Sequence, residues 1–214
     1  MCFEGIRGCT TLFKDIRFMS FVEITGQSCS GKTKFIEDEL ILNTKFHAYP
    51  KNFFTKIFNF FVGIRYLGLE RTKVLFLWSL NESASLFFRI NIFRNAVLKF
   101  GNFKDLRTSM KDDLQTYILD EGVSHLPFLF LNTDTLKVVD FVSNELSRIN
   151  VEFLKSPGHD IIKERLTLRG HKRLNFLSIS FFTNRNQDIE GVLLMEYPNL
   201  CKDLRIIKNV GDIQ

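Results

Sequence analysis

Residues 18–42 read FMSFVEITGQSCSGKTKFIEDELIL and decide the fold of this chain. Residues 18–25 (FMSFVEIT) form a short apolar run rich in strand-forming side chains, and residues 34–42 (KFIEDELIL) are typical of a helix. Between them, residues 26–33 (GQSCSGKT) match G-x-x-x-x-G-K-[ST], the phosphate-binding loop or P-loop. A strand, a glycine-bounded loop and a helix in this order are the context that the motif requires.

Each part of this motif suits a bound polyphosphate. Glycines at both ends let the backbone turn tightly and approach an anion. Successive N–H groups and the start of the helix add partial positive charge. We expect Lys32 to reach the β- and γ-phosphates and the Thr33 hydroxyl to bind Mg²⁺. The predicted nucleotide-binding residues are Gly26, Gln27, Ser28, Cys29, Ser30, Gly31, Lys32 and Thr33. The alternative is a glycine turn that precedes a helix and holds no ligand.

Length and charge narrow the class of protein. A chain of 214 residues is long enough for one α/β domain with a substantial core. The net charge of +5 favours anionic partners such as nucleotides and phosphates. The basic residues are spread along the chain without a run of five or more, which argues against dedicated nucleic-acid binding.

The sequence predicts no membrane span and a cytoplasmic location. The most apolar stretches, residues 53–69 and 74–93, are interrupted by charged side chains, so neither supplies the roughly 18 apolar residues of a span. The first 17 residues lack the long apolar segment of a signal peptide. The four cysteines form no C-x-x-C pair, which is typical of free thiols in a reducing compartment.

Strands and helices are predicted to alternate, which indicates βαβ units and a parallel sheet. Expected strands cover residues 18–25, 45–49, 115–120, 151–155 and 204–210. Expected helices cover residues 34–42, 53–64, 71–80, 83–100, the segment behind an Asp134 cap, 160–169 and 174–197. We expect Gly101 to stop the third helical piece of residues 50–113, a break near residues 184–186, and Pro198 to end the last helix.

Asp120 and Glu121 follow a buried apolar strand. An acid there is costly unless something satisfies it, and Mg²⁺ or its water ligands would do so, as at the acid of P-loop nucleotide hydrolases. Asp120 is therefore a predicted metal ligand. Glu121, one residue further on, is the candidate catalytic base. The alternative is a pair of strand-end acids that face solvent or cap the next helix.

Arg165 and Arg169 lie four residues apart, on one face of a predicted helix after a Gly/Pro turn. Two guanidinium groups there could close over a triphosphate and neutralise charge on the transferred phosphoryl group. The alternative is an ordinary solvated helix. Arg89 and Arg94 are weaker candidates for binding an anionic acceptor.

These motifs together resemble the small P-loop kinases, and within them the thymidylate-kinase and deoxynucleoside-kinase group. The residues that carry the resemblance are GQSCSGKT at 26–33, the strand ending in Asp120-Glu121-Gly122, and R-x-x-x-R-G from Arg165 to Gly170. The resemblance covers residues 18–211, although only the first motif is specific. Where those nucleotide kinases usually have Asp-Arg after the third strand, this chain has Asp120-Glu121.

The resemblance implies an α/β, three-layer P-loop nucleoside triphosphate hydrolase fold with a five-stranded parallel sheet in the order 2-3-1-4-5. It implies one domain, in which residues 1–17 are an N-terminal arm, residues 50–113 form the helical acceptor side and residues 156–173 form a lid. Arg165 and Arg169 would be the lid arginines, and residues 209–212 would lie near the adenine.

The sequence thus favours a phosphotransferase that uses ATP and Mg²⁺. The acceptor would be a small molecule, and a nucleoside, nucleotide, sugar or other metabolite all remain open. Lys32, Glu121, Arg165 and Arg169 are the predicted catalytic residues. The alternatives are a nucleotide-binding regulatory ATPase that acts through a protein partner and a sulfotransferase. The oligomeric state is not set by the sequence, a homodimer being one option.

Overall fold

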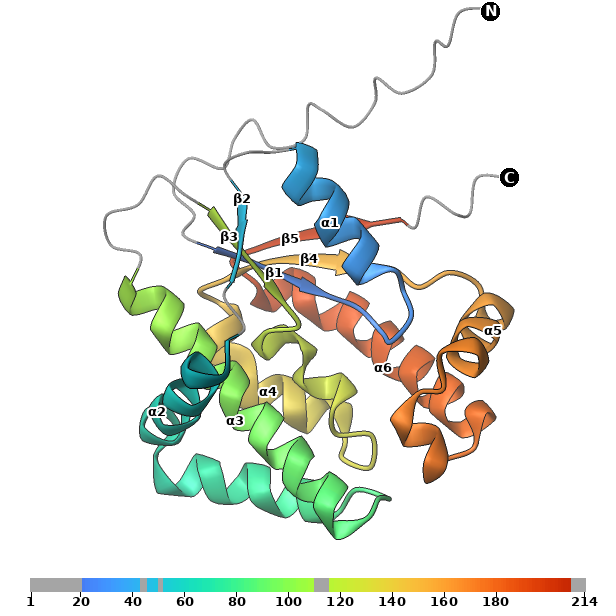
Figure 1. The fold of residues 1–214 in the computed structure, drawn as a ribbon, viewed down its shortest axis with the longest axis horizontal. Coiled ribbons are helices and arrows are strands. Elements are labelled where there is room, and N and C mark those ends of the chain that lie inside the picture. The colour runs from blue at the N-terminus through green and yellow to red at the C-terminus, as the bar shows by residue number, and fades with distance from the viewer. Residues whose placement is uncertain (1–20, 43–45, 50–51, 110–115, 209–214) are drawn as a thin grey trace, which may run out of the picture.

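Five parallel strands form one sheet in the order β2-β3-β1-β4-β5 (Figure 1). The structure is a computed structural model that describes residues 21–42, 46–49, 52–109 and 116–208. The strands are β1 (Phe21–Thr25), β2 (Phe46–Ala48), β3 (Thr116–Asp120), β4 (Asn150–Leu154) and β5 (Asp203–Ile207). The predicted fold class and strand order are confirmed. The predicted arm over residues 1–17 and the predicted adenine contact over residues 209–212 lie outside the described residues.

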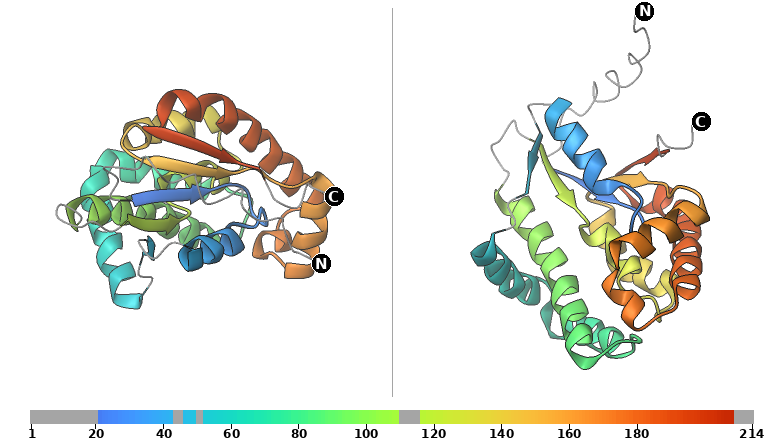
Figure 2. Two further views of the ribbon diagram at one scale, coloured as in Figure 1. Left: turned by 90° about the horizontal axis from the view of Figure 1, so that it is seen from above. Right: turned by 45° about the vertical axis from the view of Figure 1, so that its right-hand side comes forward.

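Helices cover both faces of this sheet (Figures 1 and 2). One face carries α1 (Lys32–Leu42), and the other carries α3 (Leu86–Ser109), α4 (Thr135–Leu146) and α6 (Ile179–Leu200). The remaining elements are α2 (Phe53–Leu80), which packs on α3, α5 (His159–Arg169), and the 3₁₀ helices η1 (Val123–Phe128) and η2 (Lys172–Asn175). In the described part of the chain, no helix is long and apolar enough to cross a membrane.

The side chains of β1 alternate between two unequal cores. Ile24 packs with a small cluster that includes Phe35 and Ile36 of α1, whereas Phe21 belongs to the large core beneath α3, α4 and α6. All five residues of β1 are buried, as expected for a central parallel strand covered on both faces. The strand therefore holds the start of the P-loop rigidly at the carboxyl edge of the sheet.

Helices α2 and α3 cross at two glycines. A Cβ at Gly63 would lie 2.3 Å from the Val97 carbonyl oxygen, and a Cβ at Gly101 would lie 1.8 Å from that of Asn59. The expectation that Gly101 ends its helix is wrong, because α3 continues to Ser109. The glycine there allows close approach of two backbones, a role that a glycine in a helical pattern can also have.

We expect Gly101→Ala to destabilise the protein by about 1–3 kcal/mol, since the added methyl group forces the two backbones apart. Gly191→Ala is the matched control, because Gly191 also lies inside a helix but a Cβ there meets nothing within 4 Å. The control should be neutral or stabilising by up to about 1 kcal/mol. Urea unfolding of both variants measures the difference, and equal stabilities would contradict the packing role.

The remaining helix ends agree with the sequence prediction in part. The two helices expected over 53–64 and 71–80 are present, and they meet at a kink at Gly68, whose φ of 70° and ψ of 177° are not helical. The break expected at residues 184–186 is wrong, because α6 runs without interruption from Ile179 to Leu200, and the Asn186 side chain donates to the Phe182 carbonyl within it. Pro198 does not end α6 but lies in its last turn. The Asp134 cap and the left-handed Gly170 after α5 are confirmed.

Candidate nucleotide and acceptor site

The P-loop connects β1 to α1 with left-handed residues at alternate positions. Cys29 and Gly31 have φ values of 65° and 98°, and Gly26 has a φ of 141°. A Cβ at Gly26 would lie 2.4 Å from the Leu154 carbonyl oxygen, so only glycine fits. Alternation of right- and left-handed residues forms a concave nest of N–H groups, and the first turn of α1 adds N–H groups that have no partner within the helix. The loop therefore fits a phosphate chain.

Lys32 spans the mouth of this loop. Its side chain is only 7% exposed, and its ammonium group donates to the carbonyl oxygens of Gly26 at 2.9 Å and Gln27 at 2.8 Å. The same nitrogen lies 3.3 Å from Oε1 of Glu121. A phosphate in the loop would compete with these oxygens for the ammonium group.

The sheet brings the predicted metal ligands to one edge. Asp120 pairs in register with Ile24 of β1, and the N–H of Glu121 donates to the Ile24 carbonyl at 3.0 Å. Thr33 lies in the first turn of α1, the helix that comes after β1 in the chain. Among the described residues, no group of three or more Asp, Glu, His or Cys side chains could hold a metal by itself. Mg²⁺ normally takes only one or two protein ligands beside water and phosphate, so a site made of Thr33 and Asp120 stays a prediction.

Glu121 lies among basic side chains. Its carboxylate is 3.5 Å from Nε2 of His125 and 3.3 Å from Lys32, and its backbone carbonyl accepts a hydrogen bond from Lys99. Burial alone would raise the pKa of Glu121, but His125 and the two lysines outweigh it and hold that pKa well below its usual range. Burial lowers the pKa of His125 and of Lys99. Glu121 is thus an ionised group with φ of 59°, a backbone conformation that costs energy in any residue but glycine.

The predicted lid reaches the P-loop through one of its two arginines. Arg165 of α5 donates from Nη1 to the carbonyl of Cys29 at 3.1 Å. Arg169, one turn further along, is exposed, and no hydrogen bond or ion pair joins it to the loop within the described residues. A second link runs through Glu190 of α6, which accepts from Gln27 of the loop at 3.3 Å and from the N–H of Ser156 at 3.1 Å.

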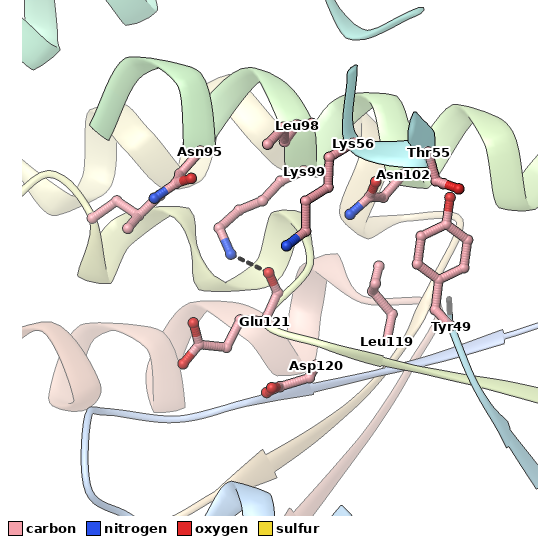
Figure 3. Close-up of a pocket in the computed structure, with 11 residues that line it drawn as sticks. Tyr49, Thr55, Lys56, Asn95, Leu98, Lys99, Asn102, Leu119, Asp120 and Glu121 are labelled. Carbon is pink, nitrogen blue, oxygen red and sulfur yellow. Dashed lines mark hydrogen bonds between the residues drawn. The ribbon is translucent and has the colours of Figure 1, made fainter. Parts of the chain in front are cut away.

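A cavity of about 230 Å³ opens on the other side of Glu121 (Figure 3). It lies between α2, α3 and the end of β3, and its lining residues on α2 and α3 belong to residues 50–113, which the resemblance assigns to the acceptor side. Figure 3 shows the ammonium groups of Lys56 and Lys99 pointing toward Glu121 from two helices. The lining residues are Tyr49, Thr55, Lys56, Asn95, Leu98, Lys99, Asn102, Leu119, Asp120, Glu121 and Leu129.

Three of the site's cationic or titratable side chains were missed by the sequence analysis. Lys56, Lys99 and His125 lie around Glu121, whereas Arg89 and Arg94, the predicted anion binders, do not line the cavity. Lys99 occupies a position of α3 that is buried along with its neighbours Ala96 and Phe100. A lysine among the apolar residues of a predicted helix is the signal that could have found it.

No family model matches the chain, and no curated protein is significantly similar to it in sequence. Functional inference therefore depends on the chemistry of the site.

Proposed function

We propose that this chain is a P-loop kinase, which transfers the γ-phosphoryl group of ATP to a small anionic acceptor with the help of Mg²⁺. The observation that carries the proposal is the position of Glu121 between two sites. Its side chain pairs with Lys32 of the P-loop, while its backbone accepts from Lys99 of the cavity. Donor and acceptor bound on either side of this residue would meet at its carboxylate. A cytoplasmic location, where ATP is available, belongs to the same proposal.

Each residue of the site would have its own role in an in-line phosphoryl transfer. Lys32 and the loop N–H groups would hold the phosphates, and Thr33 and Asp120 would hold Mg²⁺, which would neutralise charge on the phosphate oxygens. Arg165 and Arg169 add positive charge from the lid. The acceptor oxygen forms the new bond to the γ-phosphorus as the bond to the bridging oxygen of ADP breaks. Glu121 accepts the proton when the acceptor is a hydroxyl.

A screen of phosphorylated and carboxylated metabolites for ADP formation tests this function. We expect ADP release from Mg²⁺-ATP to depend on one acceptor class. Steady ATP turnover that no acceptor stimulates would instead indicate a regulatory ATPase. Metal-independent binding of a bisphosphate nucleotide would indicate a sulfotransferase. Either result would contradict the kinase proposal.

We expect Lys56→Gln to raise KM for an anionic acceptor about tenfold or more and to leave kcat nearly unchanged, since a lost charged hydrogen bond weakens ground state and transition state alike. Lys56 is exposed at the cavity wall, so its replacement should not impair folding. The control is Lys104→Gln on α3, which removes an exposed lysine that does not line the cavity. Steady-state kinetics with varied acceptor distinguish the two variants. An unchanged KM would show that the acceptor carries no anion at this position.

A further inference from the structure

The first half of α2 is apolar on the side that faces away from the protein. Its inner side is set by Asn59, Gly63 and Leu67, which recur every four residues and are buried. The opposite side carries Phe54, Ile57, Phe58 and Phe61, here called the aromatic face, whose exposed fractions are 80%, 44%, 63% and 64%. A helix that is hydrophobic on all sides normally lies inside a protein or a membrane.

The aromatic face is part of a larger apolar surface. Phe60 contacts the ring of Phe61 at 5.7 Å and that of Phe93 at 6.4 Å, and Phe93 contacts Phe76 at 5.4 Å. Phe93 of α3 therefore contacts a ring in each half of α2, Phe60 in the first half and Phe76 in the second. On α3 the exposed residues Leu86, Phe87 and Ile90 precede Phe93. With about 200 Å² for each fully exposed phenylalanine, the four residues of the aromatic face alone expose on the order of 500 Å², toward the upper end of the roughly 300–600 Å² of the largest patch on a typical monomer.

Basic side chains outnumber acidic ones among the exposed charged residues of α2 and α3. Exposed charged residues between positions 57 and 98 are Arg65, Glu70, Lys73 and Arg94, three bases and one acid. Arg65 lies on the aromatic face itself, one turn beyond Phe61. Two copies of the chain docked through this face would bring like charges together, which is unfavourable. The charge favours an anionic partner.

We propose that the aromatic face of α2 docks on an anionic lipid surface. Phenylalanine side chains on one side of a helix enter the boundary between headgroups and acyl chains, and flanking arginine and lysine side chains contact acidic headgroups. Such a helix lies in the plane of the membrane and does not cross it, in keeping with the lack of a spanning helix among the described residues. The proposal does not depend on the kinase assignment.

Sedimentation of the full chain with lipid vesicles tests the proposal. We expect binding to phosphatidylcholine vesicles that contain phosphatidylserine to exceed binding to phosphatidylcholine alone by about tenfold, and to weaken with salt. Phe58→Ser/Phe61→Ser should lower the binding about tenfold or more, because it removes two large apolar side chains from the contact. Serine matches phenylalanine in helix propensity, so the helix should persist.

The matched control is Leu136→Ser/Met195→Ser, which removes two exposed apolar side chains from α4 and α6. This variant should bind vesicles as the parent does. Equal vesicle binding by the phenylalanine variant and the parent would overturn the proposal, as would a failure of the parent to bind. Gel filtration tests whether a second copy of the chain covers the face instead. If the parent is a dimer, the phenylalanine variant is a monomer and the parent does not bind vesicles, a second copy is the occupant.

Discussion

Replacing Lys32 with methionine is expected to lower the affinity for Mg²⁺-ATP about 10- to 100-fold, the effect of one hydrogen bond to a charged group worth about 1.5–3 kcal/mol. Turnover should fall by a further factor of about 10²–10³, since Lys32 would also neutralise charge that develops during transfer. Methionine is close to lysine in length and helix propensity, so the change isolates the ammonium group. Isothermal titration calorimetry measures the affinity, and acceptor-dependent ADP release measures the turnover.

The structure requires a stability control for this variant. The Lys32 ammonium satisfies the carbonyls of Gly26 and Gln27, so its loss should itself cost about 1–3 kcal/mol of folding stability. Lys34→Met is the matched control, because Lys34 is exposed two residues further along the same helix. That variant should bind nucleotide as the parent does. If Lys32→Met is folded and binds Mg²⁺-ATP with unchanged affinity, the P-loop is not a nucleotide site.

The local backbone of the P-loop could be predicted because its residues are contiguous. Residues 26–33 carry their own strand, glycine turns and helix start, and each step follows from local backbone chemistry. The same holds for the acid at the end of β3 and for the lid helix that ends at Gly170, since a strand end and a left-handed cap are also local signals. The sheet order was implied by the resemblance, and the structure confirms it.

The cavity beside Glu121 could not be predicted, because its residues meet only through tertiary packing. Lys99 reaches the Glu121 carbonyl across 22 positions of the chain, and it does so because α3 is placed under β3. The packing of α2 on α3 depends on Gly101, whose role as a contact between helices is indistinguishable in the sequence from that of a helix stop. His125 was missed for a related reason, since its role arises from the 3₁₀ turn that brings it back to Glu121.

Glu121→Gln is expected to lower kcat about 10²- to 10⁴-fold for a hydroxyl acceptor, the usual contribution of a positioned general base. The amide keeps the size of the side chain, so the strained backbone at this position remains, but it cannot take a proton. The lowered pKa of Glu121 does not exclude this role. Phosphates that draw Lys32 away would remove a cation that holds the carboxylate ionised, and the approach of their negative charge would raise the pKa toward that of a useful base.

The same substitution should leave the affinity for Mg²⁺-ATP unchanged or increase it, because Lys32 no longer pairs with a competing carboxylate. A loss of turnover together with retained nucleotide affinity separates Glu121 from Lys32, whose replacement impairs both. Glu37→Gln, an exposed glutamate on α1, is the control and should match the parent. An unchanged kcat in Glu121→Gln would mean that the carboxylate only balances the charge of Lys32 in the empty loop. The cavity would then have to deliver an acceptor that is already ionised, such as a phosphate or carboxylate oxygen, which needs no base.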